Sequence, residues 1–150
     1  MVHADLESLL RKAIGLDTNT IGSSAIDRAV RERAAACKLA DARAYSELVN
    51  RSGPELQELI EAVVVPETWF FRDREAFAAL VGMTQQDWLA AHPEGVFRVL
   101  SLPCSTGEEP YSAAMALLDA GFPRDRFQID AVDVSMRAIA KHLGMSQQTL

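Results

Sequence analysis

The sequence predicts an α+β to α/β chain, in which an amino-terminal four-helix bundle is followed by the first βαβ unit of a parallel, doubly wound sheet. Up to about residue 65, apolar residues recur at steps of three and four, as in amphipathic helices. Two runs of β-branched and apolar residues follow, at 96–102 and 127–132, with a helical pattern between them. We expect a helical domain over 1–72, a helical linker over 73–95 and the start of an α/β domain over 96–150.

The helical domain is expected to contain four short amphipathic helices. The first places on one face the residues Leu6, Leu9, Leu10 and Ala13. The second runs from Ala25 to about Lys38, with Ser24 and Asp27 as its capping signal. Its inner stripe comprises Ile26, Ala29, Val30 and Cys37, and its outer side carries Arg28, Arg31 and Arg33.

The third and fourth helices have clear start signals. The third begins at Asp41, and its apolar residues are Tyr45, Leu48 and Val49. The fourth follows Ser52, with Pro54 in the first turn, where a missing N–H group costs nothing. Its apolar face comprises Leu56, Leu59, Ile60, Val63 and Val64, and Pro66 ends it. Four such helices joined by short links are typical of a helical bundle.

The second half of the chain follows the order strand, loop, helix, strand, helix. The first strand leads into a turn at 103–107. Glu108 then opens a helix whose apolar positions are Tyr111, Ala114, Met115 and Leu118. The second strand ends at Asp133, and Ser135 is placed to cap a last helix, which runs from Met136 to Leu143.

Composition restricts the class of protein. Of the 150 residues, 49% are hydrophobic and 24% are charged, which suits one globular domain or a small domain plus part of another. The net charge of −6 argues against a general nucleic-acid binder, which needs a positive surface. No apolar run approaches the roughly 18 residues of a membrane span, and Asp5 and Glu7 stand where a signal peptide carries positive charge. We therefore expect a cytoplasmic protein without membrane insertion.

The two cysteines, Cys37 and Cys104, have the spacing of neither metal ligands nor a disulfide framework, so no metal site is expected. Charge is uneven along the helical domain: Arg28, Arg31 and Arg33 give the second helix a basic side, whereas residues 46–67 are predominantly acidic. Two interpretations remain open. The faces are simply solvated and opposite in sign, or the arginine side docks an acidic partner.

Acidic residues follow both predicted strands, at the edge where βαβ units bind ligands. Glu108 and Glu109 lie in the first helical turn after the first strand, and Asp133 lies at the tip of the second. An acid at that tip can accept both ribose hydroxyls of a nucleoside. The pattern fits either a nicotinamide cofactor or S-adenosylmethionine, a nucleoside that carries a sulfonium group.

The loop at 103–107 distinguishes between these two cofactors. A pyrophosphate cradle needs several glycines, but this loop has a single one, Gly107, and the acidic pair Glu108 and Glu109 follows it. Repulsion between each carboxylate and a diphosphate costs about 1 kcal/mol or more at contact distance, even in water. S-adenosylmethionine has no phosphate, and its ammonium group can donate to these carboxylates. The alternative is that both glutamates only stabilise the helix macrodipole.

Three consecutive aromatic residues, at 69–71, lie between Thr68 and Arg72. A hydrophobic plug that ties the helical domain to the sheet accounts for Phe70 and Phe71, with Arg72 paired to a carboxylate. A plug does not account for the hydroxyl and the guanidinium group that flank the aromatic residues.

Two strings of the sequence, ETWFFRD at 67–73 and LSLPCSTGEEPYS at 100–112, closely resemble motifs of the CheR-type chemoreceptor glutamate methyltransferases. The variants PETWFFR and LPC are most similar to the WspC branch, which serves a surface-sensing, biofilm-controlling receptor pathway. The resemblance spans nearly the whole chain, from the helical domain to the helix after Asp133.

This resemblance implies a Rossmann-like sheet that binds S-adenosylmethionine, with S-adenosylhomocysteine as product. It implies a methyl-accepting, chemoreceptor-like partner with target glutamates on its helical cytoplasmic region. It assigns cofactor contacts to Thr68, Arg72, Pro103, Glu109 and Asp133, and receptor docking or substrate contact to Arg28, with Arg31 beside it. We expect Arg72 to act as a catalytic residue that orients a carboxylate, of the cofactor or of the substrate, through bidentate contacts.

A complete methyltransferase sheet of this type has about seven strands, whereas two are predicted here, so we expect the chain to be the amino-terminal portion of such an enzyme. Two functions remain open: a protein-glutamate methyltransferase, or a non-catalytic module that docks the receptor and carries part of the cofactor loop. A two-stranded sheet exposes unpaired edges, so we expect the truncated sheet to self-associate or to need a partner.

Overall fold

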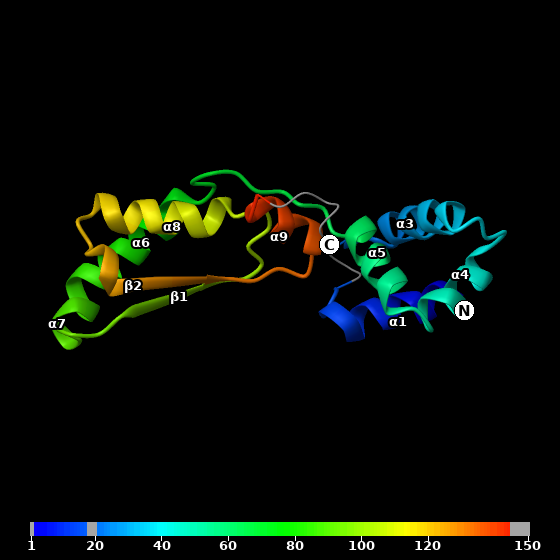
Figure 1. Ribbon diagram of the computed structural model, residues 1–150, viewed down its shortest axis with the longest axis horizontal. Coiled ribbons are helices and arrows are strands. Elements are labelled where there is room, and N and C mark those ends of the chain that lie inside the picture. Colours follow the sequence, from blue (N-terminus) through cyan, green and yellow to red (C-terminus); the bar gives the residue numbers. More distant parts are fainter. Residues whose placement is uncertain (1, 18–20, 145–150) are drawn as a thin grey trace. The chain divides into compact units, whose positions relative to one another are not determined.

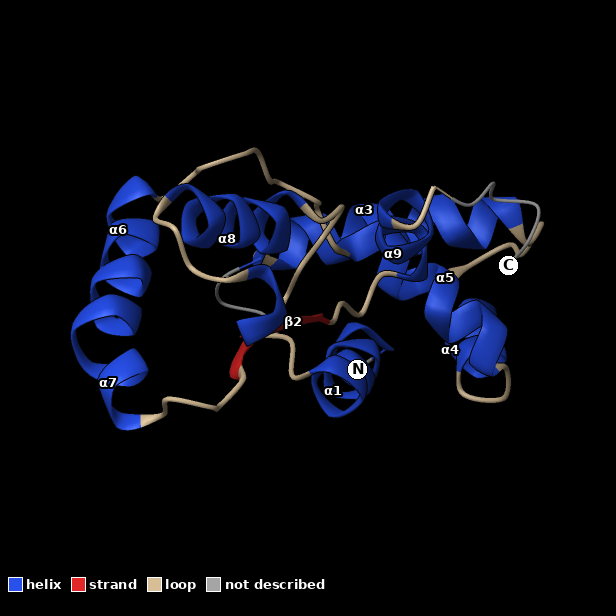
Figure 2. Cartoon of the chain, turned by 60° about the vertical axis from the view of Figure 1, so that its left-hand side comes forward, coloured by secondary structure: helices blue, strands red, loops and turns tan. Residues whose placement is uncertain are grey.

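The computed structural model describes residues 2–17 and 21–144. The chain forms two compact units, Met1–Val65 and Pro66–Leu150 (Figure 1). Helices make up most of the described chain, and a parallel two-stranded sheet lies in the second unit (Figure 2). This content confirms the predicted α+β class, while the domain limits at residues 72 and 95 stay a prediction. Within the described residues, no helix combines the length and the apolar composition needed to cross a membrane.

In its described residues, the first unit comprises the helices α1 (Val2–Ile14), α3 (Ser23–Ala36), α4 (Ala42–Val49) and α5 (Gly53–Val63). These helices share one hydrophobic core. Its buried side chains include Leu6, Leu10, Ile26, Ala29, Val30, Tyr45, Val49, Leu59, Ile60 and Val63. The predicted apolar stripes therefore supply most of the core; Ala13, predicted in the stripe of the first helix, is exposed.

Side-chain caps begin α4 and α5. A carboxylate oxygen of Asp41 accepts a hydrogen bond from the backbone N–H of Ala44 at 2.8 Å, and the hydroxyl of Ser52 accepts one from the N–H of Glu55 at 3.3 Å. Pro54 lies in the first turn of α5, where it removes no intrahelical bond. The predicted starts of both helices are confirmed.

The start of α3 differs from its prediction. The helix begins after Gly22, whose φ of 83° lies in the left-handed region that glycine adopts readily, and no side chain caps it. Ser24 lies inside the helix, so the prediction that Ser24 caps it was wrong. The reason is local backbone geometry: a left-handed residue turns the chain into the helix without a hydroxyl acceptor.

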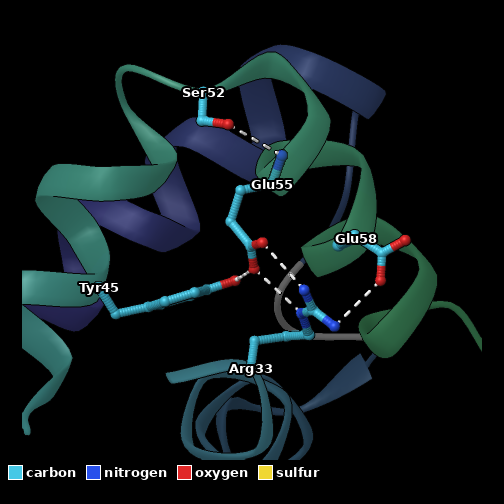
Figure 3. Close-up of polar contacts among 5 residues, drawn as sticks. All are labelled: Arg33, Tyr45, Ser52, Glu55 and Glu58. Carbon is cyan, nitrogen blue, oxygen red and sulfur yellow. Dashed lines mark hydrogen bonds and ion pairs between the residues drawn. The ribbon is translucent and has the colours of Figure 1, made fainter. Parts of the chain in front are cut away.

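The prediction that Arg33 faces outward with the other arginines of α3 was also wrong. Its side chain is 21% exposed and pairs with Glu55, with Nε donating to Oε1 at 3.0 Å and Nη2 to Oε2 at 2.9 Å (Figure 3). The hydroxyl of Tyr45 donates to the same Oε1 at 2.8 Å, and Nη1 of Arg33 lies 3.0 Å from Glu58 Oε2. This Arg33 network joins α3, α4 and α5.

Ionisation in the Arg33 network follows from these contacts. Partial burial by itself raises the pKa of the Glu55 carboxyl, but the hydrogen bonds from Arg33 and Tyr45 outweigh it and hold the pKa below its ordinary value. The hydrogen bond to Glu55 raises the pKa of Arg33. Burial, together with the same carboxylate, raises the pKa of Tyr45. At neutral pH, Arg33 and Glu55 therefore form an ion pair, and the neutral Tyr45 hydroxyl donates a hydrogen bond to the same carboxylate.

In its described residues, the second unit comprises two strands and several helical segments. They are α6 (Arg74–Met83), η1 (Thr84–Trp88, a π-helical turn), α7 (Leu89–Ala91), β1 (Phe97–Ser101), α8 (Glu108–Asp119), η2 (Arg124–Arg126, a 3-10 turn), β2 (Phe127–Ala131) and α9 (Met136–His142). The hydroxyl of Ser135 accepts from the N–H of Ala138 at 3.0 Å, which confirms the predicted cap of α9. The predicted order of strands and helices is confirmed.

The two strands run parallel, with Phe97 opposite Phe127 and Ser101 opposite Ala131. On one face, Phe97 packs in a small core with Leu117 of α8 and other apolar residues, and α8 also packs on α6 (Figure 1). Because the strands are parallel, their carboxyl ends meet at one edge of the sheet. The loop after β1 and the residues after β2 therefore lie together at that edge.

The buried face of α8 is not the one that its apolar pattern predicts. Tyr111 and Leu118 are 53% and 45% exposed, and Met115 is also exposed. The buried residues of α8 are instead Pro110, Ser112, Ala113 and Leu117. Apolar residues occur on most sides of this helix, so the sheet and α6, rather than its own periodicity, select the face that is buried.

Candidate functional site

Backbone hydrogen bonds hold the loop after β1 against the end of β2. The N–H of Cys104 donates to the carbonyl oxygen of Val132 at 2.9 Å, and the N–H of Val132 donates to that of Ser101 at 3.0 Å. Pro103, which follows a cis peptide bond, is exposed on this loop. The loop and the chain after β2 thus form one continuous region at the carboxyl edge of the sheet.

Gly107 ends the loop and begins α8. Its φ of 97° lies in the left-handed region, and its N–H donates to the carbonyl oxygen of Cys104 at 3.0 Å. A Cβ atom at this position would lie 1.8 Å from Nδ1 of His142. Both the backbone angle and the close approach of that ring therefore require glycine here.

Asp133 turns toward this loop. One carboxylate oxygen accepts from the backbone N–H of Ser105 at 2.7 Å, and the other accepts from the N–H of Ser135 at 2.8 Å. The residue that was predicted at the tip of the second strand is thereby brought to the loop that contains Pro103. Each carboxylate oxygen keeps a further lone pair for a ligand.

The two glutamates of the first turn of α8 hold the two ends of the loop. Oε1 of Glu109 accepts from the hydroxyl of Ser101 at 2.5 Å, and Oε2 of Glu108 accepts from the hydroxyl of Thr106 at 2.6 Å. Both carboxylates also lie where they stabilise the amino-terminal end of the helix dipole. Glu109 is exposed, so its remaining lone pairs are accessible.

The loop environment is electronegative and contains an unsatisfied hydroxyl. Burial raises the pKa of the Cys104 thiol, and the carboxylates of Asp133 and Glu109 raise it further. The Oγ atom of Ser105 is buried and, among the residues that the structure describes, has no hydrogen-bond partner. A buried hydroxyl without a partner is costly in a folded chain, so it is available to a ligand that enters the loop. A site lined by two carboxylates and a hydroxyl suits a cationic ligand better than a phosphate.

The aromatic segment, which we define as residues 66–72, is attached to the same helix. The N–H of Phe71 donates to Oγ of Ser112 at 2.9 Å, and Ser112 is fully buried in α8. Thr68 is half-buried, and its hydroxyl has no hydrogen bond within the described ranges. Helix α8 therefore contacts both the predicted aromatic motif and the loop after β1.

Arg72 closes the aromatic segment on itself. Its Nη1 donates to the carbonyl oxygen of Glu67 at 2.7 Å, and its guanidinium carbon lies 4.8 Å from the centre of the Trp69 ring. Within residues 2–17 and 21–144, the other guanidinium N–H groups make no hydrogen bond, and the side chain is exposed. They are therefore free to bind a carboxylate in a bidentate manner.

The two predicted docking arginines lie on α3 in the first unit. Arg28 is 3.9 Å from Glu32 one turn later, and both side chains are largely exposed. Arg31 lines a cavity of about 360 Å³, together with Asp27, Asp41 and apolar residues of α3, of the link between α3 and α4, and of the start of α4.

Sequence reasoning missed the serines that hold the site together. The Ser101 hydroxyl donates to Glu109, the backbone N–H groups of Ser105 and Ser135 donate to Asp133, and the Ser112 hydroxyl accepts from Phe71 of the aromatic segment. For Ser112 a signal existed, because it lies four residues after Glu108 and thus on the same side of the helix. Its partner, 41 residues away at Phe71, has no signal in the sequence.

Comparison with known proteins gives this site a context. Residues 66–147 match the family model described as "CheR methyltransferase, SAM binding domain". The chain belongs to the CheR methyltransferase family. The resemblance inferred from the sequence motifs is confirmed, and the methyl donor that this domain binds is S-adenosylmethionine.

Relatives with assigned names are similar over most of the chain. It is 50% identical over 135 residues to the probable biofilm formation methyltransferase WspC of Pseudomonas aeruginosa, which covers 90% of this chain and 32% of that relative. Its identity to the protein of the same name from Pseudomonas putida is 46% over 132 residues, or 88% and 31% of the two chains. Its identity to chemotaxis protein methyltransferase 2 of Vibrio cholerae is 37% over 97 residues, or 65% and 32%. The chain spans about a third of the length of these curated relatives.

The part that matches the CheR family model begins where the second unit begins, at Pro66. It includes the aromatic segment, the loop after β1, the first turn of α8 and Asp133. Arg28 and Arg31 lie outside it, in the first unit, and their roles stay predictions.

Proposed function

We propose that this chain takes part in the S-adenosylmethionine-dependent methylation of glutamate side chains on a chemoreceptor-like signalling protein, linked to biofilm signalling. The observation that carries the proposal is the turning of Asp133 onto the loop after β1, beside the acidic first turn of α8. Membership of the CheR family and the names of the relatives support the reaction class.

We propose further that β1, α8 and β2 are the first βαβ unit of a Rossmann-like sheet, and that the helices of the first unit form a four-helix bundle. The parallel pairing of β1 with β2 and the packing of α8 on β2 support the first assignment. The common core of the first unit supports the second.

The residues of the second unit suit the cofactor by their chemistry. Asp133 has lone pairs for the ribose hydroxyls, and Glu109 has lone pairs for an ammonium group, while Pro103 is exposed on the same loop and offers an apolar surface. Thr68 and the Ser105 hydroxyl add uncharged donors. When bound, S-adenosylmethionine supplies an electrophilic methyl group on a sulfonium.

Arg72 is proposed as the catalytic residue. The substrate glutamate has a reference pKa of about 4.3, so it is already ionised at neutral pH and needs no general base. The free N–H groups of Arg72 can hold a carboxylate, of cofactor or substrate, in the orientation needed for in-line attack. The interaction between Arg72 and a substrate carboxylate must stay moderate, because neutralising that carboxylate would make it a weaker nucleophile.

For the partner, we propose docking of the receptor on α3 through Arg28 and Arg31. The exposed side chain of Arg28 supports an electrostatic contact with an acidic helix, and the largely apolar cavity beside Arg31, which Asp27 and Asp41 also line, is able to take an apolar side chain. A second candidate function is a non-catalytic docking module. The exposed side chain of Arg28 on α3 supports it, because docking through this arginine needs no cofactor.

Asp133→Asn is expected to weaken the binding of S-adenosylhomocysteine at least tenfold, measured by calorimetry with the chain. The asparagine amide keeps one acceptor oxygen, so it cannot serve both the Ser105 N–H and a ribose hydroxyl pair. Asp130→Asn is the matched control, since Asp130 lies three residues earlier, in β2, and its carboxylate pairs with Arg98. Equal affinities of the two variants would exclude the proposed role of Asp133.

Arg72→Ala is expected to lower methyl transfer, or cofactor binding, tenfold or more. Labelled S-adenosylmethionine and receptor helices are incubated with the chain, and methyl ester formation and docking are measured together. Arg74→Ala, an exposed arginine in the first turn of α6, is the control. Unchanged transfer by Arg72→Ala removes its catalytic role, and docking without any transfer by the parent chain selects the non-catalytic module.

A further inference from the structure

The aromatic segment has no regular secondary structure, yet a hydrogen bond from its backbone reaches α8. The N–H of Phe71 donates to Oγ of Ser112 at 2.9 Å, across 41 residues of sequence. Ser112 is fully buried, which shields the acceptor side of this bond from water. The segment is therefore fixed to α8 by a buried side chain of that helix.

The direction of the Ser112 hydroxyl is set by a second bond. Its O–H donates to the carbonyl oxygen of Glu108, one turn earlier in α8, at 2.6 Å. A hydroxyl has one proton and two lone pairs, so this donation leaves the lone pairs to accept from Phe71. Serine in a helix often bonds back to the carbonyl four residues earlier. Here the same oxygen also holds a distant segment.

The backbone of Phe71 needs such support. Its φ of 54° lies in the left-handed region, which a bulky aromatic residue rarely adopts. Conformations of this kind persist where surrounding contacts hold them. The ring of Phe71 packs edge to face on Phe77 of α6, with centroids 5.7 Å apart, and its N–H is held by Ser112.

The placement of Arg72 depends on this turn, because it follows Phe71 directly. Arg72 stacks on Trp69 and donates to the carbonyl oxygen of Glu67, so these contacts tie its side chain to the rest of the segment. The acidic first turn of α8, with Glu108 and Glu109, lies one helical turn before Ser112. The Phe71–Ser112 bond thus sets how the aromatic segment lies relative to that turn.

We propose that Ser112 is a positioning residue, whose hydroxyl holds the aromatic segment against α8 so that Thr68, Arg72 and the acidic first turn act on one cofactor. The placement of the segment stands on the contacts alone. The effect on the cofactor rests on the proposed function, so the two parts are measured separately.

The placement is tested without cofactor, through acrylamide quenching of Trp69, whose signal is assigned with Trp69→Phe. Ser112→Ala is expected to raise the quenching of the half-exposed Trp69 about twofold, because the lost acceptor releases the Phe71 N–H. Ser112→Thr keeps the hydroxyl and is expected to restore the parent value. If its extra methyl group unfolds the unit, Ser112→Cys, a weaker acceptor of similar volume, is expected to give an intermediate value.

Leu117→Ala is the matched control for stability. It removes a buried side chain of the same helix but leaves the Phe71–Ser112 bond intact, so Trp69 quenching in the folded chain is expected to stay at the parent value. If Leu117→Ala and Ser112→Ala raise the quenching equally, or if Ser112→Ala leaves it unchanged, the positioning role is overturned.

The effect on the cofactor is measured by calorimetry with S-adenosylhomocysteine. Ser112→Ala is expected to weaken binding about tenfold, and Ser112→Thr and Leu117→Ala less than threefold. If the parent chain binds but Ser112→Ala binds equally well, the link to the cofactor is overturned while the proposed function stands. If the parent chain does not bind, the proposed function fails, and the quenching still decides the placement.

Discussion

Arg33→Ala is expected to lower the free energy of unfolding of the first unit by about 2 kcal/mol, less than the loss for a fully buried ion pair because this pair is only partly buried. The variant leaves the Glu55 carboxylate, whose side chain is 11% exposed, with the Tyr45 hydroxyl and without a cation. Denaturant unfolding followed by circular dichroism measures the change. Arg31→Ala, on the exposed side of the same helix, is the control and is expected to change stability by less than about 0.5 kcal/mol.

The same network predicts an acid-sensitive contribution to stability. The pKa of Glu55 is lower in the folded chain than in the unfolded one, so the unfolded state binds the proton more readily. This contribution is fully present above the unfolded pKa of about 4.3 and is lost as the pH falls through the folded value. Arg33→Ala is expected to remove most of this dependence. Equal losses in the Arg33 and Arg31 variants, with the same pH profile, would contradict the structural role of the network.

Leu117→Ala is expected to lower the free energy of unfolding of the second unit by about 3 kcal/mol, because Leu117 is fully buried between α8 and the sheet. Leu118→Ala removes the same atoms one residue later, where the side chain is 45% exposed. Its expected effect is less than about 0.5 kcal/mol. Thermal unfolding of the two variants under the same conditions measures the difference.

This pair of variants decides which face of α8 is buried. The apolar pattern of the sequence places Leu118 on the inner face, with Tyr111 and Met115, and predicts the larger loss for Leu118→Ala. The structure predicts the reverse order. A larger loss from Leu118→Ala would therefore show that the helix is rotated from the orientation described here.

Much of the fold could be predicted from the sequence because the signals are local. Asp41 and Ser52 cap helices within three residues of themselves, and Ser135 does so for α9. The strands predicted at 96–102 and 127–132 are one or two residues shorter in the structure, where they span Phe97–Ser101 and Phe127–Ala131. The prediction was wrong for Arg33, which was expected on the outer side of its helix. Its partner Glu55 lies 22 residues away on another helix, so no local pattern indicates this pairing.

In the candidate site, too, the sequence predicted some features and missed others. Asp133 and the glutamates of α8 could be placed at one edge because parallel strands bring their carboxyl ends together. That Asp133 bonds to the Ser105 N–H, and that Ser112 holds Phe71, could not be inferred, because hydrogen bonds between separated segments leave no periodic pattern.

By itself, the amino-acid sequence determined the helical and strand periods, most of the caps, the acidic start of the helix after the first strand and the motifs of the family. Tertiary structure alone decided which side of α8 is buried, that Arg33 turns inward, and which serine anchors the aromatic segment. The physical reason is range. Propensity, capping and periodicity act over a few residues, whereas burial and side-chain pairing depend on which distant segment packs against a helix. A helix with apolar residues on several sides can bury more than one of its faces.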